Sequence, residues 1–175
     1  MEDFILIRPT SEYASQLAEY RQEFLDADSS MDGCGPLRRF EDPIEYIQEC
    51  KNYENPETVP SHLVPATQFL FVRKRDNRLV GMIQVRHCFN DFLEKYAGHI
   101  GYSVRPSERR KGYAKEMLRM TLPYCREIGL ERVLISCIEG NIGSERTILA
   151  NGGVYESTVH EPNEHVELKR FWIEL

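Results

Sequence analysis

Residues 99–114, with the sequence HIGYSVRPSERRKGYA, join an extended run to a basic loop and the start of a helix. The extended run predicts a strand over 97–104, which stops before Pro106 because proline cannot donate to a strand ladder. The helix is predicted to run to about Ile128, since apolar residues recur along one side of it. Pro123 lies inside that helix, but the apolar phase continues across it, so one kinked helix is expected.

The basic loop at 109–114, RRKGYA, has the features of a phosphate site. The first turn of a helix exposes unpaired N–H groups and a partial positive charge, which suit an anion. Gly112 lets a ligand approach the backbone closely, and Ala114 keeps the next contact small. Three cations at a helix start gain little from the macrodipole, so a bound anion explains them better than a solvated basic loop does. The chain has neither GxxxxGK[ST] nor GxGxxG, which disfavours a P-loop or a dinucleotide fold.

The apolar run 132–138 follows the long helix and is typical of a strand buried on both faces. It is predicted to pair in parallel with the strand over 97–104 through a right-handed crossover. Hairpins on either side make the expected sheet mixed. The other predicted elements are a strand at 4–8, a helix capped by Thr10 or Ser11, a helix over 42–53, a hairpin of strands 69–72 and 79–85, a short helix capped by Asn141, and strands over 154–160 and 166–175.

Composition indicates an ordinary globular chain, with 175 residues, 41% hydrophobic and 29% charged. No run of about eighteen apolar residues occurs, so no membrane span or membrane partner is expected. The net charge of −6 argues against nucleic acid and weakly favours a cationic acceptor. The acidic first residues lack a signal-peptide core, which predicts a cytoplasmic protein. The five cysteines are odd in number and form no CxxC pair, so neither a zinc site nor any other metal site is expected.

Three motifs resemble the GNAT superfamily of acyl-CoA-dependent N-acyltransferases. The loop 109–114 looks like its pyrophosphate signature, in which Gln or Arg is followed at the third position by Gly and at the fifth by Gly or Ala. Residues 99–106 are similar to the family's fourth strand. The pattern Asn141-x-x-Ser144-x-Arg146-x-Ile148 resembles a helix motif of the branch related to ribosomal-protein N-terminal acetyltransferases. The similarity covers about 69–156.

The resemblance implies a fold class, α/β (α+β), and a single acetyltransferase domain over 1–175. The expected sheet has six to seven mostly antiparallel strands, about four flanking helices, and a central parallel pair splayed around the cofactor. Residues 1–66 would form the acceptor side, 67–156 the acetyl-CoA-binding core, and 157–175 the closing strand.

The implied co-substrate is acetyl-CoA, with its pantetheine arm along the fourth strand and its pyrophosphate on the loop amides. The implied cofactor-binding residues are Tyr102, Ser103, Val104, Arg109, Arg110, Lys111, Gly112, Tyr113, Ala114, Asn141 and Ser144.

Direct acetyl transfer needs an oxyanion donor and is helped by a proton donor for the leaving thiolate. By family analogy the oxyanion donor is a backbone N–H near Val104 or Ser103. Much of the superfamily places a tyrosine in the last helix as the acid, but the matching position here is Ile148. Ser144 or Asn141 are the substitutes, although each could instead be an ordinary residue of a helix start.

The candidates for the general base are His99, Glu139 and Glu94. His99 titrates in the useful range, but strand alternation puts it on the face opposite Tyr102 unless a bulge occurs at Gly101. A strand histidine is also often structural. Glu139 ends a strand at the carboxyl edge, where open sheets bind ligands. Glu94 precedes the strand and is equally typical of a solvated acid.

The predicted function is transfer of an acetyl group to a primary amine of a small molecule or a protein N-terminus. A non-catalytic acyl-CoA-binding or sensor module is the alternative, and an unrelated nucleotide-phosphate binder is a third. A homodimer is a further implication of the resemblance. The candidate acceptor-lining residues are Tyr20, Arg38, Arg39, Phe40 and His87.

Overall fold

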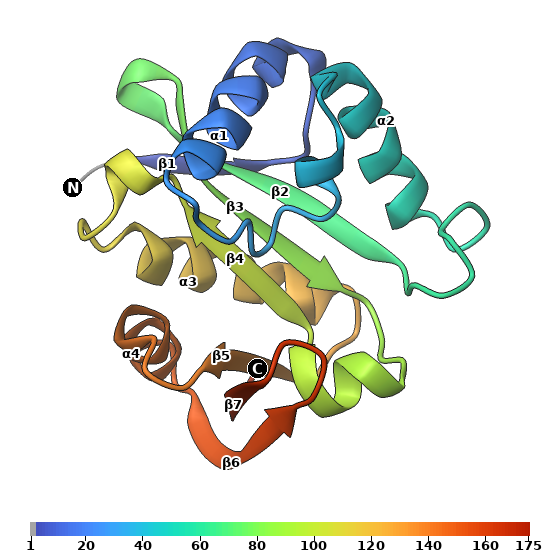
Figure 1. Ribbon diagram of the computed structural model, residues 1–175, viewed down its shortest axis with the longest axis vertical. Coiled ribbons are helices and arrows are strands. Elements are labelled where there is room, and N and C mark those ends of the chain that lie inside the picture. Colours follow the sequence, from blue (N-terminus) through green and yellow to red (C-terminus); the bar gives the residue numbers. More distant parts are fainter. Residues whose placement is uncertain (1–2) are drawn as a thin grey trace.

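The computed structural model describes residues 3–175, which form four α-helices and seven strands (Figure 1). The helices are α1 Ala14–Asp26, α2 Pro43–Glu54, α3 Tyr113–Glu127 and α4 Ile142–Ala150. The strands are β1 Phe4–Ile7, β2 Ala66–Arg73, β3 Arg78–Arg86, β4 Ile100–Val104, β5 Arg132–Ile138, β6 Val154–Glu161 and β7 Val166–Glu174. The predicted class, strand number and helix number are confirmed.

The strands form two antiparallel sheets rather than one mixed sheet. The first has the order β1-β2-β3-β4 and the second the order β5-β7-β6. The predicted parallel ladder between β4 and β5 is therefore wrong. The segment before β4 is linked to β5 by an isolated antiparallel bridge between Gly98 and Ile135 and by the His99 N–H, which donates to the Leu134 carbonyl at 2.8 Å. Next to that bridge the His99 ring accepts the Leu134 N–H at 2.9 Å, so a side chain occupies the place that a strand partner would take. Beyond this point β4 and β5 are splayed, as expected.

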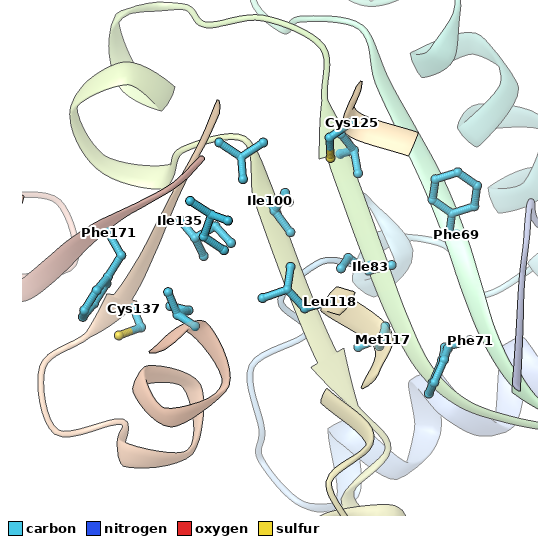
Figure 2. Close-up of a cluster of buried hydrophobic side chains, with 14 of the residues drawn as sticks. Phe69, Phe71, Ile83, Ile100, Met117, Leu118, Cys125, Ile135, Cys137 and Phe171 are labelled. Carbon is cyan, nitrogen blue, oxygen red and sulfur yellow. The ribbon is translucent and has the colours of Figure 1, made fainter. Parts of the chain in front are cut away.

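The first sheet is covered on both faces, which explains why its strands are apolar on both sides. Alternation along β2 sends Leu70 and Val72 towards α1 and α2, and Phe69 and Phe71 towards α3. Figure 2 shows the apolar cluster on the α3 side, which continues from Phe69 and Phe71 on the first sheet to Ile135 and Phe171 on the second sheet. One core therefore joins the two sheets beside α3 and α4. The face under α1 and α2 has a separate core.

Most of the predicted helix boundaries are confirmed. Asp42 caps α2 by accepting the Ile44 N–H at 2.8 Å. Pro123 lies inside a continuous α3. The predicted cap at Thr10 or Ser11 is wrong, because a short 3-10 turn precedes α1 and the Thr10 side chain makes no capping hydrogen bond.

The segment before β4 differs from the prediction of an early strand start. One turn of π-helix, Leu93–Ala97, occupies it, and Gly98 follows with φ 71°. The bulge at Gly101 that would put His99 and Tyr102 on one face does not form, since Gly101 pairs with Gln84 in an unbroken register. His99 and Tyr102 consequently point to opposite faces.

Residues 3–175 include no helix that is both long and apolar enough to cross a membrane. Within the same range no three His, Cys, Asp or Glu side chains gather closely enough to hold a metal ion. The five cysteines are free thiols, and Cys88 alone of them is exposed.

Candidate active site

The start of α3 presents backbone donors to an open space. Gly112 precedes the helix with φ 80°, Arg110 has φ 64°, and the N-cap residue Gly112 has no side chain with which to cap the helix. The first turn of an uncapped helix leaves its N–H groups free for an anion. A Cβ built on Gly112 would meet no atom within 4 Å, so a ligand can approach the backbone there.

The three cations of the loop have different surroundings. Arg109 donates to the Val104 carbonyl at 3.1 Å and to the Ser29 hydroxyl at 2.9 Å. Lys111 donates to Glu108 at 2.7 Å. The prediction that these cations gain little structurally is thus wrong for Arg109 and Lys111. Arg110 is exposed and has no partner among residues 3–175, so it is the cation of the loop that remains for a ligand.

The Glu108 carboxylate stabilises the loop from its buried side. It accepts from Arg73 at 2.9 Å, from Arg78 at 2.9 Å and from Lys111 at 2.7 Å. Burial alone would raise the pKa of Glu108, but hydrogen bonds and charges from Lys111 and Arg73 outweigh it and lower that pKa to about 2. The carboxylate therefore stays charged and keeps the loop in place.

The Tyr113 side chain belongs to the core and not to the open surface of this site. Its ring is buried in the core, and its hydroxyl accepts from Arg73 at 3.0 Å. As a cofactor-binding residue, Tyr113 could therefore act only through its amide at the helix start. Ala114 is half-buried beside it.

The edge of β4 next to the loop is unpaired. The Arg105 N–H donates to the Val80 carbonyl of β3 at 2.8 Å. Since backbone groups alternate in an antiparallel pair, those of Ser103 also face β3, and those of Tyr102 and Val104 face the opening between β4 and β5. Of the predicted pantetheine-pairing residues, Tyr102 thus faces the opening with both backbone groups. Val104 faces it with its N–H, since its carbonyl accepts from Arg109 at 3.1 Å.

Ser103 is directed away from this opening. Its hydroxyl lies 2.9 Å from the Tyr20 hydroxyl and 3.3 Å from the Cys34 thiol, both on the α1 side of the sheet. The residue is buried there, and its backbone belongs to the ladder. The prediction of Ser103 as a cofactor contact or oxyanion donor is therefore not supported by its geometry.

Two hydroxyl groups meet on the other face of β4. The Tyr102 hydroxyl lies 2.7 Å from the Ser144 hydroxyl in the first turn of α4. Burial raises the pKa of Tyr102, so its phenol stays protonated at neutral pH. Burial also raises the pKa of the neighbouring Cys137 thiol to about 11. The cluster can donate protons but contains no ready nucleophile.

The turn before α4 carries the other predicted residues of this side. Asn141 caps α4 by accepting the Ser144 N–H at 3.2 Å, as predicted. Glu139 is exposed just after β5, and its N–H donates to the Glu167 carbonyl at 2.8 Å. Its carboxylate is thus open to solvent near the end of the strand.

Comparison with known proteins connects this geometry to a family. The sequence profile described as "Acetyltransferase (GNAT) family" matches residues 31–152, which is more than half of the chain. The chain belongs to the GNAT acetyltransferases. No curated protein sequence matches it significantly.

Solved GNAT-like structures are similar over nearly the whole chain. The ribosomal-protein-S5-alanine acetyltransferase of Vibrio fischeri has a TM-score of 0.75 at 18% identity, over 99% of this chain and 94% of that chain. RimL in complex with coenzyme A has a TM-score of 0.71 at 14% identity, over 98% of this chain and 94% of that chain. The self-immunity acetyltransferase MccE, in complex with acetyl-CoA and AMP, has a TM-score of 0.69 at 18% identity, over 100% and 94%. At these identities the likeness shows the fold.

In this GNAT chain His99 makes the contacts of a structural residue. It is buried, its Nδ1 accepts the Leu134 N–H, and its ring centroid lies 4.0 Å from that of Phe89. Burial, and after it the charge of Arg86, lowers the pKa of His99 to about 4. A neutral ring with an occupied Nδ1 fits the structural interpretation better than the prediction of a general base.

His99 and Glu94 share a hollow of about 550 Å³ that is lined by neither Tyr102 nor Ser144. Glu94 is exposed there, and its carbonyl accepts from Arg170 at 3.0 Å. The GNAT fold thus separates these two predicted bases from the hydroxyl pair, while Glu139 follows the strand that bears Cys137.

The predicted acceptor-lining residues have structural partners. Tyr20 bonds Ser103, Arg38 donates to the Ser29 carbonyl, Arg39 donates to Tyr53, the Phe40 ring lies near Tyr46, and His87 bonds Thr67. The sequence analysis did not single out Arg86, which lies on the face of the first sheet that α1 and α2 cover. An arginine ending the apolar strand run over 79–85 was the available signal.

Proposed function

We propose that this GNAT chain transfers an acetyl group from acetyl-CoA directly to a primary amine of a small molecule or a protein N-terminus. The observation that carries the proposal is the uncapped start of α3, open at Gly112 and adjacent to the free edge of β4. The solved structures of MccE and RimL contain acetyl-CoA and coenzyme A, respectively, on a similar fold.

The residues fit an acyl-CoA in a defined order. We propose that the amides of 110–114, with the Arg110 side chain, hold the diphosphate. Backbone groups of Tyr102 and Val104 would pair with the pantetheine amides, and Asn141 would contact them from the other side. The sulfur end would lie near Cys137 and Ser144.

The proposed chemistry uses few side chains. The acceptor nitrogen bonds to the acetyl carbon, the carbon–sulfur bond breaks, and a Tyr102 or Val104 N–H stabilises the oxyanion between these events. Ser144, backed by the Tyr102 hydroxyl at 2.7 Å, donates a hydrogen bond or proton to the departing sulfur. Glu139, or solvent, takes the proton that the ammonium group loses. The Cys137 thiol stays protonated, which favours direct transfer over an acyl-enzyme.

Two measurements test this proposal. Acetyl-CoA is expected to raise the melting temperature of the protein, whereas ATP and NAD are not, because ligand that binds only the folded state stabilises it by mass action. A panel of amines is then tested for thiol release and for acetylated product by mass spectrometry. Acetyl-CoA binding without turnover on any amine would favour the non-catalytic module, and absence of binding would contradict both functions.

We also propose that the protein forms a homodimer. Sedimentation of the same sample tests the proposed homodimer.

A further inference from the structure

A cluster of polar side chains lies on the face of the first sheet opposite the hydroxyl pair. The loop at 32–35 crosses this face, and Gly33, with φ 70°, packs on the backbone of Gly101 and Tyr102 so closely that a Cβ would overlap both. Gln68 fastens the loop by donating to the Gly33 carbonyl at 2.7 Å. The loop and β4 therefore form one continuous surface beside the proposed reaction centre.

Polar side chains under this loop lack partners. Gln68 Oε1 is buried without a hydrogen bond, and the Gln84 side chain makes none among residues 3–175. Arg86, two residues along the same face of β3, makes a single long hydrogen bond, from Nη1 to the Gly98 carbonyl at 3.4 Å. Within that range no carboxylate forms an ion pair with it. Such groups cost free energy unless a ligand satisfies them.

Arg86 lies close to where the acetyl group would be. Its Nη2 is 3.3 Å from the position of a Cβ built on Gly101. Gly101 directly precedes Tyr102, whose backbone N–H faces the opening, and neighbouring Cα atoms are about 3.8 Å apart. With the acetyl group at that N–H, as proposed above, a group held by the guanidinium would be a few bonds from the acceptor nitrogen.

Burial lowers the pKa of Arg86 to about 10, and the charge of Asp32 partly offsets that shift. Asp32 is exposed at the start of the loop, so it offers a carboxylate to a cationic amine nearby. Arg86 and Asp32 together offer opposite charges on one small surface.

We infer that the acceptor carries a carbonyl oxygen, of a carboxylate or a peptide group, next to the amine, and that Arg86 binds this oxygen. The inference rests on the proposed function and narrows its substrate class. The Gln84 side-chain amide, which lies beside Arg86 on the same face, suits a neighbouring polar atom of the same acceptor. A polyamine has no oxygen to give Arg86 and would place a second cation beside it.

A matched set of amines tests this. The probes are 2-aminopropane, alaninamide, alanine and a peptide with N-terminal alanine, which share the carbon bearing the amine and differ in the carbonyl group. The wild-type kcat/KM is expected to be at least about tenfold higher for a carbonyl-bearing probe than for 2-aminopropane, as a charged hydrogen bond allows. Preference for alanine would identify a carboxylate as the recognised group, and preference for the peptide would identify the carbonyl of a polypeptide N-terminus.

The variant Arg86→Met should remove this preference while leaving the KM for acetyl-CoA and the acetyl-CoA thermal shift unchanged. Arg86→Lys keeps the positive charge but loses the two-pronged guanidinium group, so it should retain part of the preference. This variant also tests the inference if Arg86→Met does not fold. Arg126→Met, on the exposed side of α3, is the matched control and should behave as wild type.

Two results would overturn the inference while leaving acetyl transfer intact. One is turnover of 2-aminopropane or spermidine equal to or above that of every carbonyl-bearing probe. The other is an equal loss with all probes in Arg86→Met. Failure of acetyl-CoA to bind at all would instead overturn the proposed function.

Discussion

At the residue scale, the Tyr102 and Ser144 hydroxyl groups are 2.7 Å apart and link β4 to α4. The sequence showed that Ile148 replaces the tyrosine common in the family, and it offered Ser144 as a substitute. It could not show that the Tyr102 hydroxyl reaches Ser144 from β4. That contact depends on how far the two sheets are splayed, which no local pattern encodes.

Ser144→Ala is expected to lower kcat by about tenfold to hundredfold, because the departing sulfur loses its proton donor. The KM for acetyl-CoA should change little, since the diphosphate contacts are elsewhere. Steady-state kinetics with a turned-over amine measures both. Ser157→Ala on β6, whose half-buried position lies away from the hydroxyl pair and whose hydroxyl donates to Glu156, is the control. An unchanged kcat in Ser144→Ala would remove the hydroxyl pair from the mechanism.

At the element scale, the strand–loop–helix segment from β4 to α3 was predictable because its signals are local. Pro106 limits the strand, and Gly112 and the apolar stripe set the helix. The roles of the loop cations were not predictable. Arg109 and Lys111 bond to groups that include Ser29, far away in sequence, and Glu108, whose burial depends on Arg73 of another strand.

Gly112→Trp is expected to abolish acetyl-CoA binding by filling the space over the α3 amides. Gly129→Trp is a close control, since Gly129 ends the same helix with φ 91° and its Cβ would also meet nothing within 4 Å. Both changes strain a left-handed residue and should cost about 1–3 kcal/mol of stability. Calorimetric titration with acetyl-CoA separates them. Equal affinity in the two variants would contradict the assignment of the loop.

At the scale of the whole molecule, two antiparallel sheets share one core, and the His99 ring joins them at the closed end of the opening. The sequence predicted the number of strands and their order along the chain. It wrongly predicted a parallel ladder, because the crossover rule applies to strands of the same sheet. Nothing near His99 in sequence reveals that its ring accepts the N–H of Leu134.

His99 predicts a pH dependence of stability. Its folded pKa of about 4 lies below the ordinary 6.5, so between these values the unfolded chain binds more protons. The stability it contributes is complete above pH 6.5 and is lost as the pH falls towards 4, by about 3 kcal/mol. Urea unfolding at pH 7.5 and pH ~4.5 measures it.

His99→Gln keeps an acceptor for Leu134 but does not titrate, so its free energy of unfolding should fall less over the same interval. His62→Gln, at an exposed histidine, should leave the wild-type dependence in place. Identical pH dependence in wild type and His99→Gln would show that the ring does not join the sheets as described.

The most direct measurement is a crystal structure of the protein with coenzyme A. We expect the diphosphate on the backbone amides of 110–114, the pantetheine arm along the free edge at Tyr102 and Val104, and the sulfur beside Ser144. Coenzyme A bound with its diphosphate away from the first turn of α3, or a fully occupied crystal with that turn empty, would contradict the account.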